Sequence, residues 1–341
     1  MKDEEYRLSM TVAGMCFGQS KYTKANQLYE KALLIIREFG DKSGEAMCYG
    51  NLGAVYLSLG EYEKARQHLE KSLEMKKEIG DRNGEATSYV NLGNVYLSVG
   101  EYEKARERHE KSLVIEKEIG NRNGEASSHG HLGRVYRSLG EYEKARQHLE
   151  KSLLIQKEIG DRNGEASSYV NLGDAYQSVG EYEQVRKYLQ KSLVIQKEIG
   201  DRNGEASSHG NLGCVYRSLG EYEKARQHLE KSLVMWKEIG DRNGEASFHG
   251  NLGCVYRSLG EYEKARQHLE KSLLIQKEIG NRSGEATSYL NLGETYQSVE
   301  EYEQVRKYLR ITCDAERNWR QRGRSVLLWK PWKCVSFNWR I

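Results

Sequence analysis

Residues 51–71 read NLGAVYLSLGEYEKARQHLEK, and this stretch decides the fold because it returns along the chain with a period of 40 residues. Its second half, EYEKARQHLEK, recurs unchanged at three later places, which begin at Glu141, Glu221 and Glu261. The segment 206–245 differs from 246–285 at only six positions. Self-similarity at this period is typical of helical repeat proteins, in which each unit packs on its neighbours.

Each unit carries the pattern of two helices, which we call helix A and helix B. In 46–59 the predicted core residues are spaced by three and four positions, as on one face of a helix: Tyr49, Leu52, Gly53 and Tyr56. The same spacing continues over 61–79, where the predicted buried residues are Tyr62, Ala65, Leu69, Ser72, Leu73 and Ile79. Gly60 and Gly80 are suited to end the two helices, and Asp81 to cap the next one.

Composition and charge narrow the class of protein. Of 341 residues, 53 are Lys or Arg and 50 are Asp or Glu, so the formal net charge is only +3, and we expect no nucleic-acid partner. Proline occurs once, at Pro331, which favours helices over proline-rich β turns. No stretch is apolar enough to span a bilayer, and the acidic N-terminus lacks the apolar run of a secretory signal. We therefore expect a cytoplasmic protein with reduced cysteines, including a free Cys214 and Cys254.

The repeat sets the predicted domain organisation. Seven full-length units are readable, at 6–45, 46–85, 86–125, 126–165, 166–205, 206–245 and 246–285. The first unit is degenerate, which suits an N-terminal cap, and an incomplete eighth unit begins at Thr287. We place the solenoid at 6–322, with the last helix running to about Arg322. A basic, tryptophan-rich tail follows at 323–341, and it is interpreted as a plug on the end of the solenoid, a poorly ordered stretch, or a membrane or nucleic-acid contact.

These residues resemble a known family. The residues that match the signature of the tetratricopeptide repeat are Leu52, Gly53, Tyr56, Gly60, Tyr62, Ala65, Leu69, Ser72 and Leu73. The string GDRNGEA at 80–86 is similar to the long repeats of the Pins/LGN group of G-protein-signalling modulators, and to large tandem tetratricopeptide proteins of animals. The resemblance implies an all-α, right-handed superhelical solenoid of antiparallel helix pairs, about 16 helices in all. It also implies a concave groove, lined by helix A, that binds peptides.

The repeat argues against catalysis. Nucleotide-binding, zinc-protease and serine-hydrolase motifs are missing from the sequence. Most histidines recur at equivalent positions, whereas an active site is a single constellation. His129 and His131 could contribute to a metal site, but no third ligand has the required spacing. His109 replaces leucine at a core position and is interpreted as a local packing defect. We therefore expect no enzyme activity and no cofactor.

The candidate binding site is the face of helix A opposite its core residues. One position there repeats in almost every unit, as Asn51, Asn91, His131, Asn171, Asn211, Asn251 and Asn291, which we call the asparagine row. Side-chain amides donate and accept hydrogen bonds, so a row of them suits the backbone of an extended peptide. The position three residues later varies between units, as Ala54, Asn94, Arg134, Asp174, Cys214, Cys254 and Glu294. The position a further three residues on also varies between units, as Leu57, Leu97, Arg137, Gln177, Arg217, Arg257 and Gln297.

Variation on one face of near-identical copies is what a binding groove would produce, although drift of exposed positions after duplication would look the same. Arg134, Arg137, Arg217 and Arg257 predict a locally basic groove that prefers acidic peptides. The sequence therefore predicts a monomeric scaffold or adaptor that binds protein partners. The alternatives are a G-protein-signalling regulator of the Pins/LGN type and the sensor or regulatory array of a larger protein. The Pins/LGN units usually place arginine after Gly-Glu-Ala, where this chain has Met, Thr or Ser.

Overall fold

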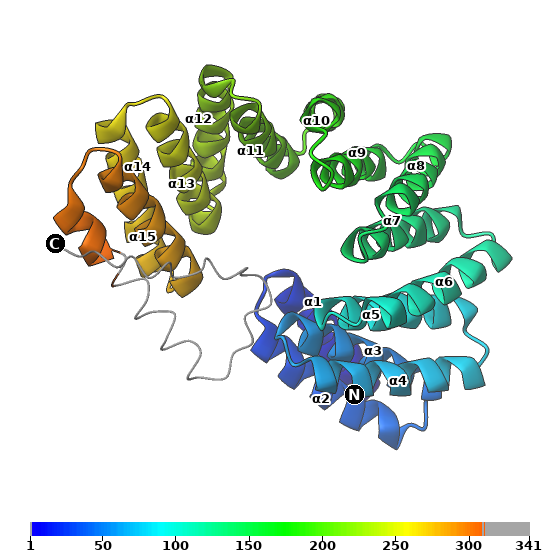
Figure 1. Cartoon of the computed structure of the whole chain (residues 1–341). Coiled ribbons are helices and arrows are strands. Elements are labelled where there is room, and N and C mark those ends of the chain that lie inside the picture. Colours follow the sequence, from blue (N-terminus) through cyan, green and yellow to red (C-terminus); the bar gives the residue numbers. More distant parts are fainter. Residues whose placement is uncertain (1, 309, 311–341) are drawn as a thin grey trace. The chain divides into compact units, whose positions relative to one another are not determined.

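The computed structural model describes residues 2–308 and 310. Every regular element in these residues is an α-helix (Figure 1). The bounds are α1 Lys2–Gly18, α2 Tyr22–Glu38, α3 Lys42–Ser58, α4 Tyr62–Glu78, α5 Arg82–Ser98, α6 Tyr102–Glu118, α7 Arg122–Ser138, α8 Tyr142–Ile159, α9 Arg162–Gln177, α10 Tyr182–Glu198, α11 Arg202–Ser218, α12 Tyr222–Ile239, α13 Arg242–Ser258, α14 Tyr262–Glu278 and α15 Arg282–Gln297. A further helical segment begins at 302 and continues through 308. The predicted all-α class and its helix pairs are confirmed; the extension of the last helix to Arg322 and the tail 323–341 lie outside the described residues.

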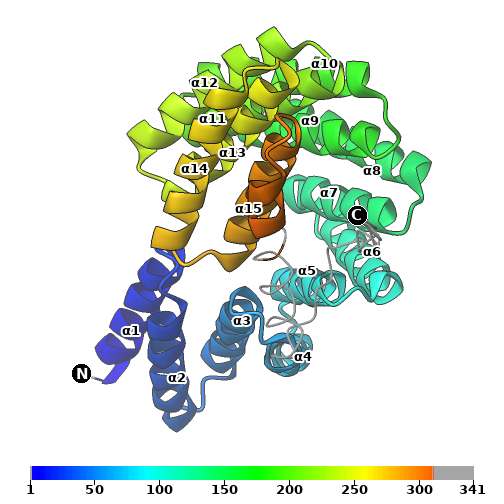
Figure 2. The same cartoon turned by 60° about the vertical axis from the view of Figure 1, so that its left-hand side comes forward.

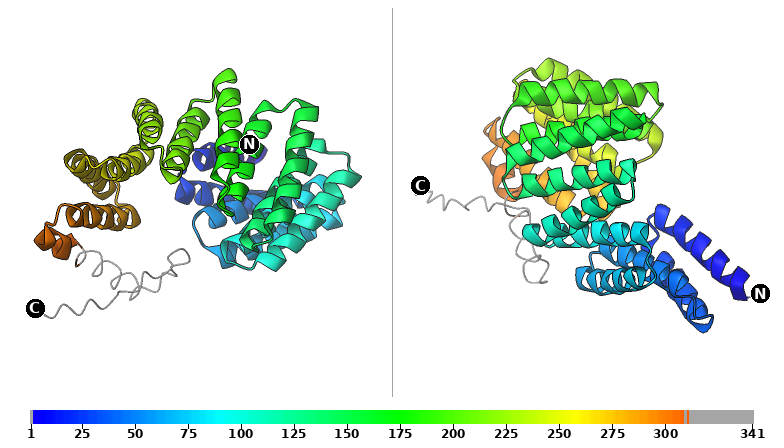
Figure 3. Two further views of the ribbon diagram at one scale, coloured as in Figure 1. Left: turned by 45° about the horizontal axis from the view of Figure 1, so that its top comes forward. Right: turned by 90° about the vertical axis from the view of Figure 1, so that its right-hand side faces the viewer.

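The chain divides into two compact parts, Met1–Ile199 with α1–α10 and Gly200–Ile341 with α11–α15. The odd-numbered helices are A helices, and within each part those from α1 to α13 each pack against the helix B that follows (Figures 2 and 3). Within each part, a helix B also contacts the helix A of the next unit, as in α4 with α5 and α12 with α13. Neighbouring odd-numbered helices touch one another as well, as in α7 with α9 and α13 with α15. The A helices of each part therefore form a continuous layer.

The connections follow the predicted turn chemistry. Gly60 and Gly80 have φ values of 74° and 73°, in the left-handed region that glycine tolerates best. Asp81 accepts a hydrogen bond from the amide of Gly84 and caps α5. In units one and eight the turn glycine after helix A is replaced by Ser20 and Glu300, which still adopt φ values of 57° and 62°. The turn geometry is thus kept even where the favoured residue is missing.

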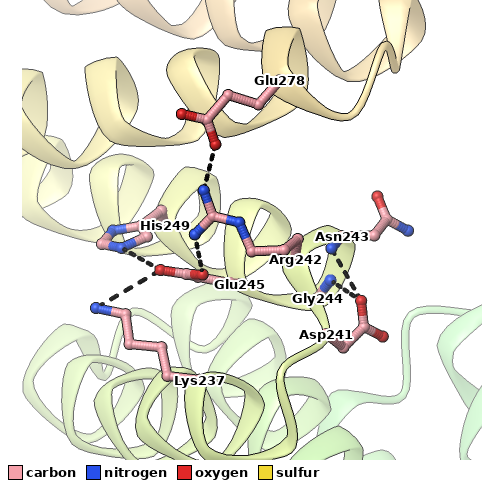
Figure 4. A network of polar contacts seen from close by, with 8 residues as sticks. All are labelled: Lys237, Asp241, Arg242, Asn243, Gly244, Glu245, His249 and Glu278. Carbon is pink, nitrogen blue, oxygen red and sulfur yellow. Dashed lines mark hydrogen bonds and ion pairs between the residues drawn. The ribbon is translucent and has the colours of Figure 1, made fainter.

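Ion pairs join the start of helix A to the end of the helix B that follows it. Figure 4 shows this network around α13, where Arg242 pairs with Glu245 in its own first turn at 2.6 Å and with Glu278 at the end of α14. Asp241 caps the same helix by accepting from the amides of Asn243 and Gly244. The arginine that begins helix A contacts both glutamates in α5, α7, α9, α11 and α13, at Arg82, Arg122, Arg162, Arg202 and Arg242. The exposed pairs add little individually, but they recur in one register.

The core lies between helices A and B, as the spacing predicts. Leu52 and Leu69 are almost completely buried, and a side chain at Gly53 would collide with Leu69, so glycine permits the close approach of α3 and α4. The prediction was wrong for Tyr62 and Ile79, which are 37% and 38% exposed. Both lie at an end of helix B, next to a turn, where the side chain is only partly covered. None of the helices in the described part of the chain is both long and apolar enough to cross a bilayer.

Candidate functional site

The asparagine row lies at the surface of the helix A layer. Each of these residues is one position before a fully buried leucine, such as Leu52 after Asn51, and its side chain leaves the core on the opposite side of the helix. Most of the row is half-buried, and Asn211 is exposed. Because neighbouring A helices touch, the row is continuous within each part: Asn51, Asn91, His131 and Asn171 in the first, and Asn211, Asn251 and Asn291 in the second.

Two of the predicted groove arginines are held in ion pairs with the next unit. Arg137 on α7 contacts Asp174 on α9 at 2.9 Å, with side chains 33% and 40% exposed. Arg257 on α13 contacts Glu294 on α15 at 2.6 Å and also donates to the backbone carbonyl of Asn291 at 3.4 Å. Carboxylates of the same face therefore already neutralise Arg137 and Arg257, and the role of these two arginines in binding a ligand stays a prediction.

Arg217 on α11 differs from these two. The position that would supply its carboxylate, 37 residues later, is Cys254, which is buried and uncharged. Among the described residues, no acidic side chain pairs with Arg217. Its guanidinium lies near Cys214, where it opposes the rise in the thiol pKa that burial causes. Arg217 is thus a half-buried cation on the helix A face whose neighbours leave its charge uncompensated.

Arg134 is the second arginine of this face without an acidic partner in the described residues. It is exposed, and the residue 37 positions before it is Leu97, which carries no charge to pair with it. Its charge and the burial of His131 lower the pKa of His131 to about 4, burial being the larger cause. The His131 ring stacks on His109 with ring centroids 4.9 Å apart. His131 is therefore a neutral, packed member of the asparagine row.

The remaining histidines belong to the packing between helices A and B. Three pairs share one geometry, with Nδ1 atoms 2.9–3.0 Å apart: His129 with His148, His209 with His228, and His249 with His268. In the described residues no three His, Cys, Asp or Glu side chains are arranged to hold a metal ion. Cys214 and Cys254 are free thiols, as predicted.

Sequence reasoning missed the ion pairs between units, although the sequence contained a signal for them. Arg137 and Asp174 are 37 residues apart, and so are Arg257 and Glu294. A search for opposite charges at this separation would have found both pairs and left Arg217 without one. The repeat period of 40 directed attention to equivalent positions instead, and the contact between consecutive A helices joins positions that are not equivalent.

The chain is a helical repeat protein whose A helices form a layer within each part and carry a polar row. More specifically, it belongs to the tetratricopeptide repeat family, whose sequence profile matches residues 6–78, 84–158, 164–238 and 244–314. The resemblance to the Pins/LGN group is not confirmed by these comparisons. No protein of curated function matches the chain by sequence.

Solved structures show similar folds at low sequence identity. A STAND (signal transduction ATPase with numerous domains) protein with a tetratricopeptide repeat sensor, from Pyrococcus horikoshii, has a TM-score of 0.69 and 19% identity; the match covers 93% of this chain and 48% of that one. Aspartyl phosphate phosphatase F from Bacillus subtilis has a TM-score of 0.65 and 14% identity, over 85% and 75% of the two chains. A Rap protein complexed with Competence and Sporulation Factor has a TM-score of 0.60 and 14% identity, over 93% and 99%. At these identities the likeness concerns the fold alone.

Proposed function

We propose that this protein is a protein-interaction module that binds an extended peptide along the asparagine row of the second part, with Arg217 as the contact for an acidic side chain. The uncompensated charge of Arg217 carries the proposal. A half-buried guanidinium gains charge-assisted, bidentate hydrogen bonds from a carboxylate and loses less hydration than a lysine would. Asn211 and Asn251 flank it along the same face and can pair with the peptide backbone.

This proposed site is more specific than a groove that is basic along its whole length. Arg257 is held by Glu294, so a peptide carboxylate would have to displace an existing ion pair there. At Arg217 no such competitor exists in the described residues, and a ligand carboxylate adds an interaction without removing one. We therefore expect selectivity for one acidic position in the peptide rather than for overall negative charge. Cytoplasmic location and a monomeric state belong to the same proposal.

The test begins with an array of 15-residue peptides that vary the position and number of glutamates, probed with the whole chain. The best peptide is then titrated against the wild type and against Arg217→Gln. Loss of one charge-assisted contact should weaken binding about tenfold. The affinity of the wild type should fall as salt rises, and the variant should show a smaller dependence.

Two matched variants complete the design. Lys231→Gln removes one positive charge from the exposed side of α12 in the same unit and should leave binding unchanged. Arg257→Gln should weaken binding less than Arg217→Gln, because Arg257 is already paired. If Arg217→Gln and Lys231→Gln bind the peptide equally well, the assignment of this site is wrong and the variable positions reflect drift after duplication.

Two more specific functions remain as alternatives. One alternative is a regulator of the Pins/LGN type, whose units usually place arginine after Gly-Glu-Ala. In this chain those positions hold Met47, Thr87, Ser127, Ser167, Ser207, Ser247 and Thr287. A sensor array of a larger protein would bind its ligand on the same face, so the peptide experiment applies to it as well. A peptide array that shows no saturable binding would favour a purely architectural role.

A further inference from the structure

We propose that the outer face of α1 is a second interaction surface, which binds an amphipathic helix of the same type as this chain's own B helices. Two large apolar side chains carry the proposal: Leu8 is 65% exposed and Met15 is 62% exposed. Both occupy positions whose equivalents on α7, Ser128 and Val135, contact the preceding unit. Within the first part, α1 is the outermost helix (Figure 2).

The later units show what such positions normally contact. The position of Met15 is buried in every later helix A, as Val55, Val95, Val135, Ala175, Val215, Val255 and Thr295. The position of Leu8 is at most 3% exposed in six of them, as Cys48, Ser88, Ser128, Ser168, Ser208 and Ser288. For α3, α5, α7, α9, α13 and α15 the cover includes the helix B of the preceding unit, and α1 has no such helix among the described residues.

Specific contacts confirm which side these positions face. The hydroxyl of Ser128 on α7 lies 3.2 Å from that of Ser112 on α6, which is the preceding helix B. The equivalent contact recurs between Ser168 and Ser152 at 3.2 Å. Val135 on α7 packs with Tyr96 and Ala105 of the preceding unit. Leu8 and Met15 are therefore displayed where a preceding helix B would pack.

A terminal repeat that needs no partner would carry polar residues on its outer face. At these two positions α1 carries leucine and methionine, where most later units have serine and valine. Larger side chains reach further from α1. They therefore suit a separate partner helix that packs at a greater distance than a helix B of the same chain does. They also make this face adaptable, since methionine fits irregular surfaces.

Charge complementarity specifies the partner further. In the internal units a glutamate near the start of helix A faces a basic residue near the end of the preceding helix B. Glu45 contacts Arg37 at 2.9 Å, and Glu245 lies 3.9 Å from Lys237 (Figure 4). The equivalent residue on α1 is Glu5, whose side chain is 47% exposed and paired with Lys31 of α2. A partner helix with aliphatic residues on one face and a lysine or arginine in its last turn matches this arrangement.

The experiment uses the chain's own helix B as the probe. A labelled peptide with the sequence of α8, YEKARQHLEKSLLIQKEI, is titrated against the whole protein by fluorescence anisotropy. Saturable binding is expected, and the variant with Leu8→Glu and Met15→Glu should bind at least tenfold more weakly. Both substitutions are at exposed positions, so folding should be kept, which circular dichroism and a thermal melt check.

The matched control places the same substitutions on another exposed aliphatic pair. Val114→Glu with Val194→Glu changes α6 and α10 at residues that are each 55% exposed, and it should leave the affinity unchanged. A peptide with Glu in place of its lysine at position 157 should bind about threefold more weakly, and Glu5→Lys should restore its affinity. Arg217→Gln should have no effect, which separates this surface from the peptide site.

Three outcomes would overturn the proposal. The first is the absence of saturable binding of the α8 peptide. The second is equal affinity in the wild type and in the Leu8→Glu, Met15→Glu variant. The third is a dimer of the wild type, seen by sedimentation, that these two substitutions dissociate; the occupant would then be a second copy of the chain rather than a separate helix.

Discussion

His109 on α6 is the residue that fits its surroundings least well. It is completely buried, and neither ring nitrogen has a hydrogen-bond partner. Its position holds leucine in units two, four, six and seven, where Leu69, Leu149, Leu229 and Leu269 are at most 2% exposed. Gly93 faces the ring, as Gly53 faces Leu69, so the space opposite the side chain is the same. The description of His109 as a packing defect is supported by this structure.

We expect His109→Leu to raise the free energy of unfolding by about 1–3 kcal/mol at neutral pH, because the buried unsatisfied nitrogens are removed. Burial lowers the pKa of His109 to about 3, whereas an unfolded histidine titrates near 6.5. The unfolded state therefore binds the proton first as pH falls, and the wild type loses stability from about pH 6.5 toward pH 3. Urea unfolding at pH 7.5 and pH 5 should show a larger gain at pH 5. A loss of stability at either pH would contradict this account.

At the scale of the element, the helices could be predicted from the sequence and part of their packing could not. Spacing by three and four residues, glycine turns and aspartate caps are local signals, and they located both helices of each unit. Tyr62 and Ile79 fit the same spacing but are exposed, because burial at a helix end depends on neighbouring helices rather than on periodicity. The Arg137–Asp174 pair joins two A helices and could not be derived from any single unit. The residues of the asparagine row are half-buried, or exposed at Asn211, and their role in binding stays a prediction.

The histidine pairs between helices A and B give an element-scale prediction. Burial is the main cause that lowers the pKa of His129 and of His148 to about 4, and the cations of Lys117 and Lys151 act in the same direction. Folded pKa values below the unfolded value mean that this contribution to stability is complete above about pH 6.5 and is lost as pH falls toward 4. Unit five has tyrosines at both positions, with ring centroids 6.0 Å apart.

Replacing both histidines of one pair by tyrosine, as His129→Tyr with His148→Tyr, should therefore make unfolding less sensitive to acid. The urea midpoint of the wild type should fall between pH 7 and pH 5 by more than that of the double variant. The same double change at His249 and His268 should have a similar effect, because the geometry of the two pairs is the same. An unchanged pH dependence in both double variants would show that these pairs titrate in the folded protein as they do in the unfolded chain.

At the scale of the whole molecule, stability is distributed along the repeat. Within each part, each helix contacts the helices next to it in the sequence, and consecutive A helices such as α7 and α9 also touch. In such an array the free energy of unfolding is close to a sum over units and their interfaces. A defect in one unit should then loosen that unit and its neighbours and leave distant units unchanged, in contrast to a compact domain that unfolds as a whole.

Leu132→Ala tests this directly, because Leu132 on α7 is completely buried and its truncation should cost about 2–5 kcal/mol. Hydrogen exchange followed by mass spectrometry should show faster exchange in α7 and α8, a smaller increase in α6 and α9, and none in α13 and α14. Lys144→Ala, at an exposed position of the same unit, should change no segment by a comparable amount. Faster exchange along the entire chain would instead identify a single cooperative unit. Local loosening would also bear on function, because a peptide bound across several units stabilises each interface that it spans.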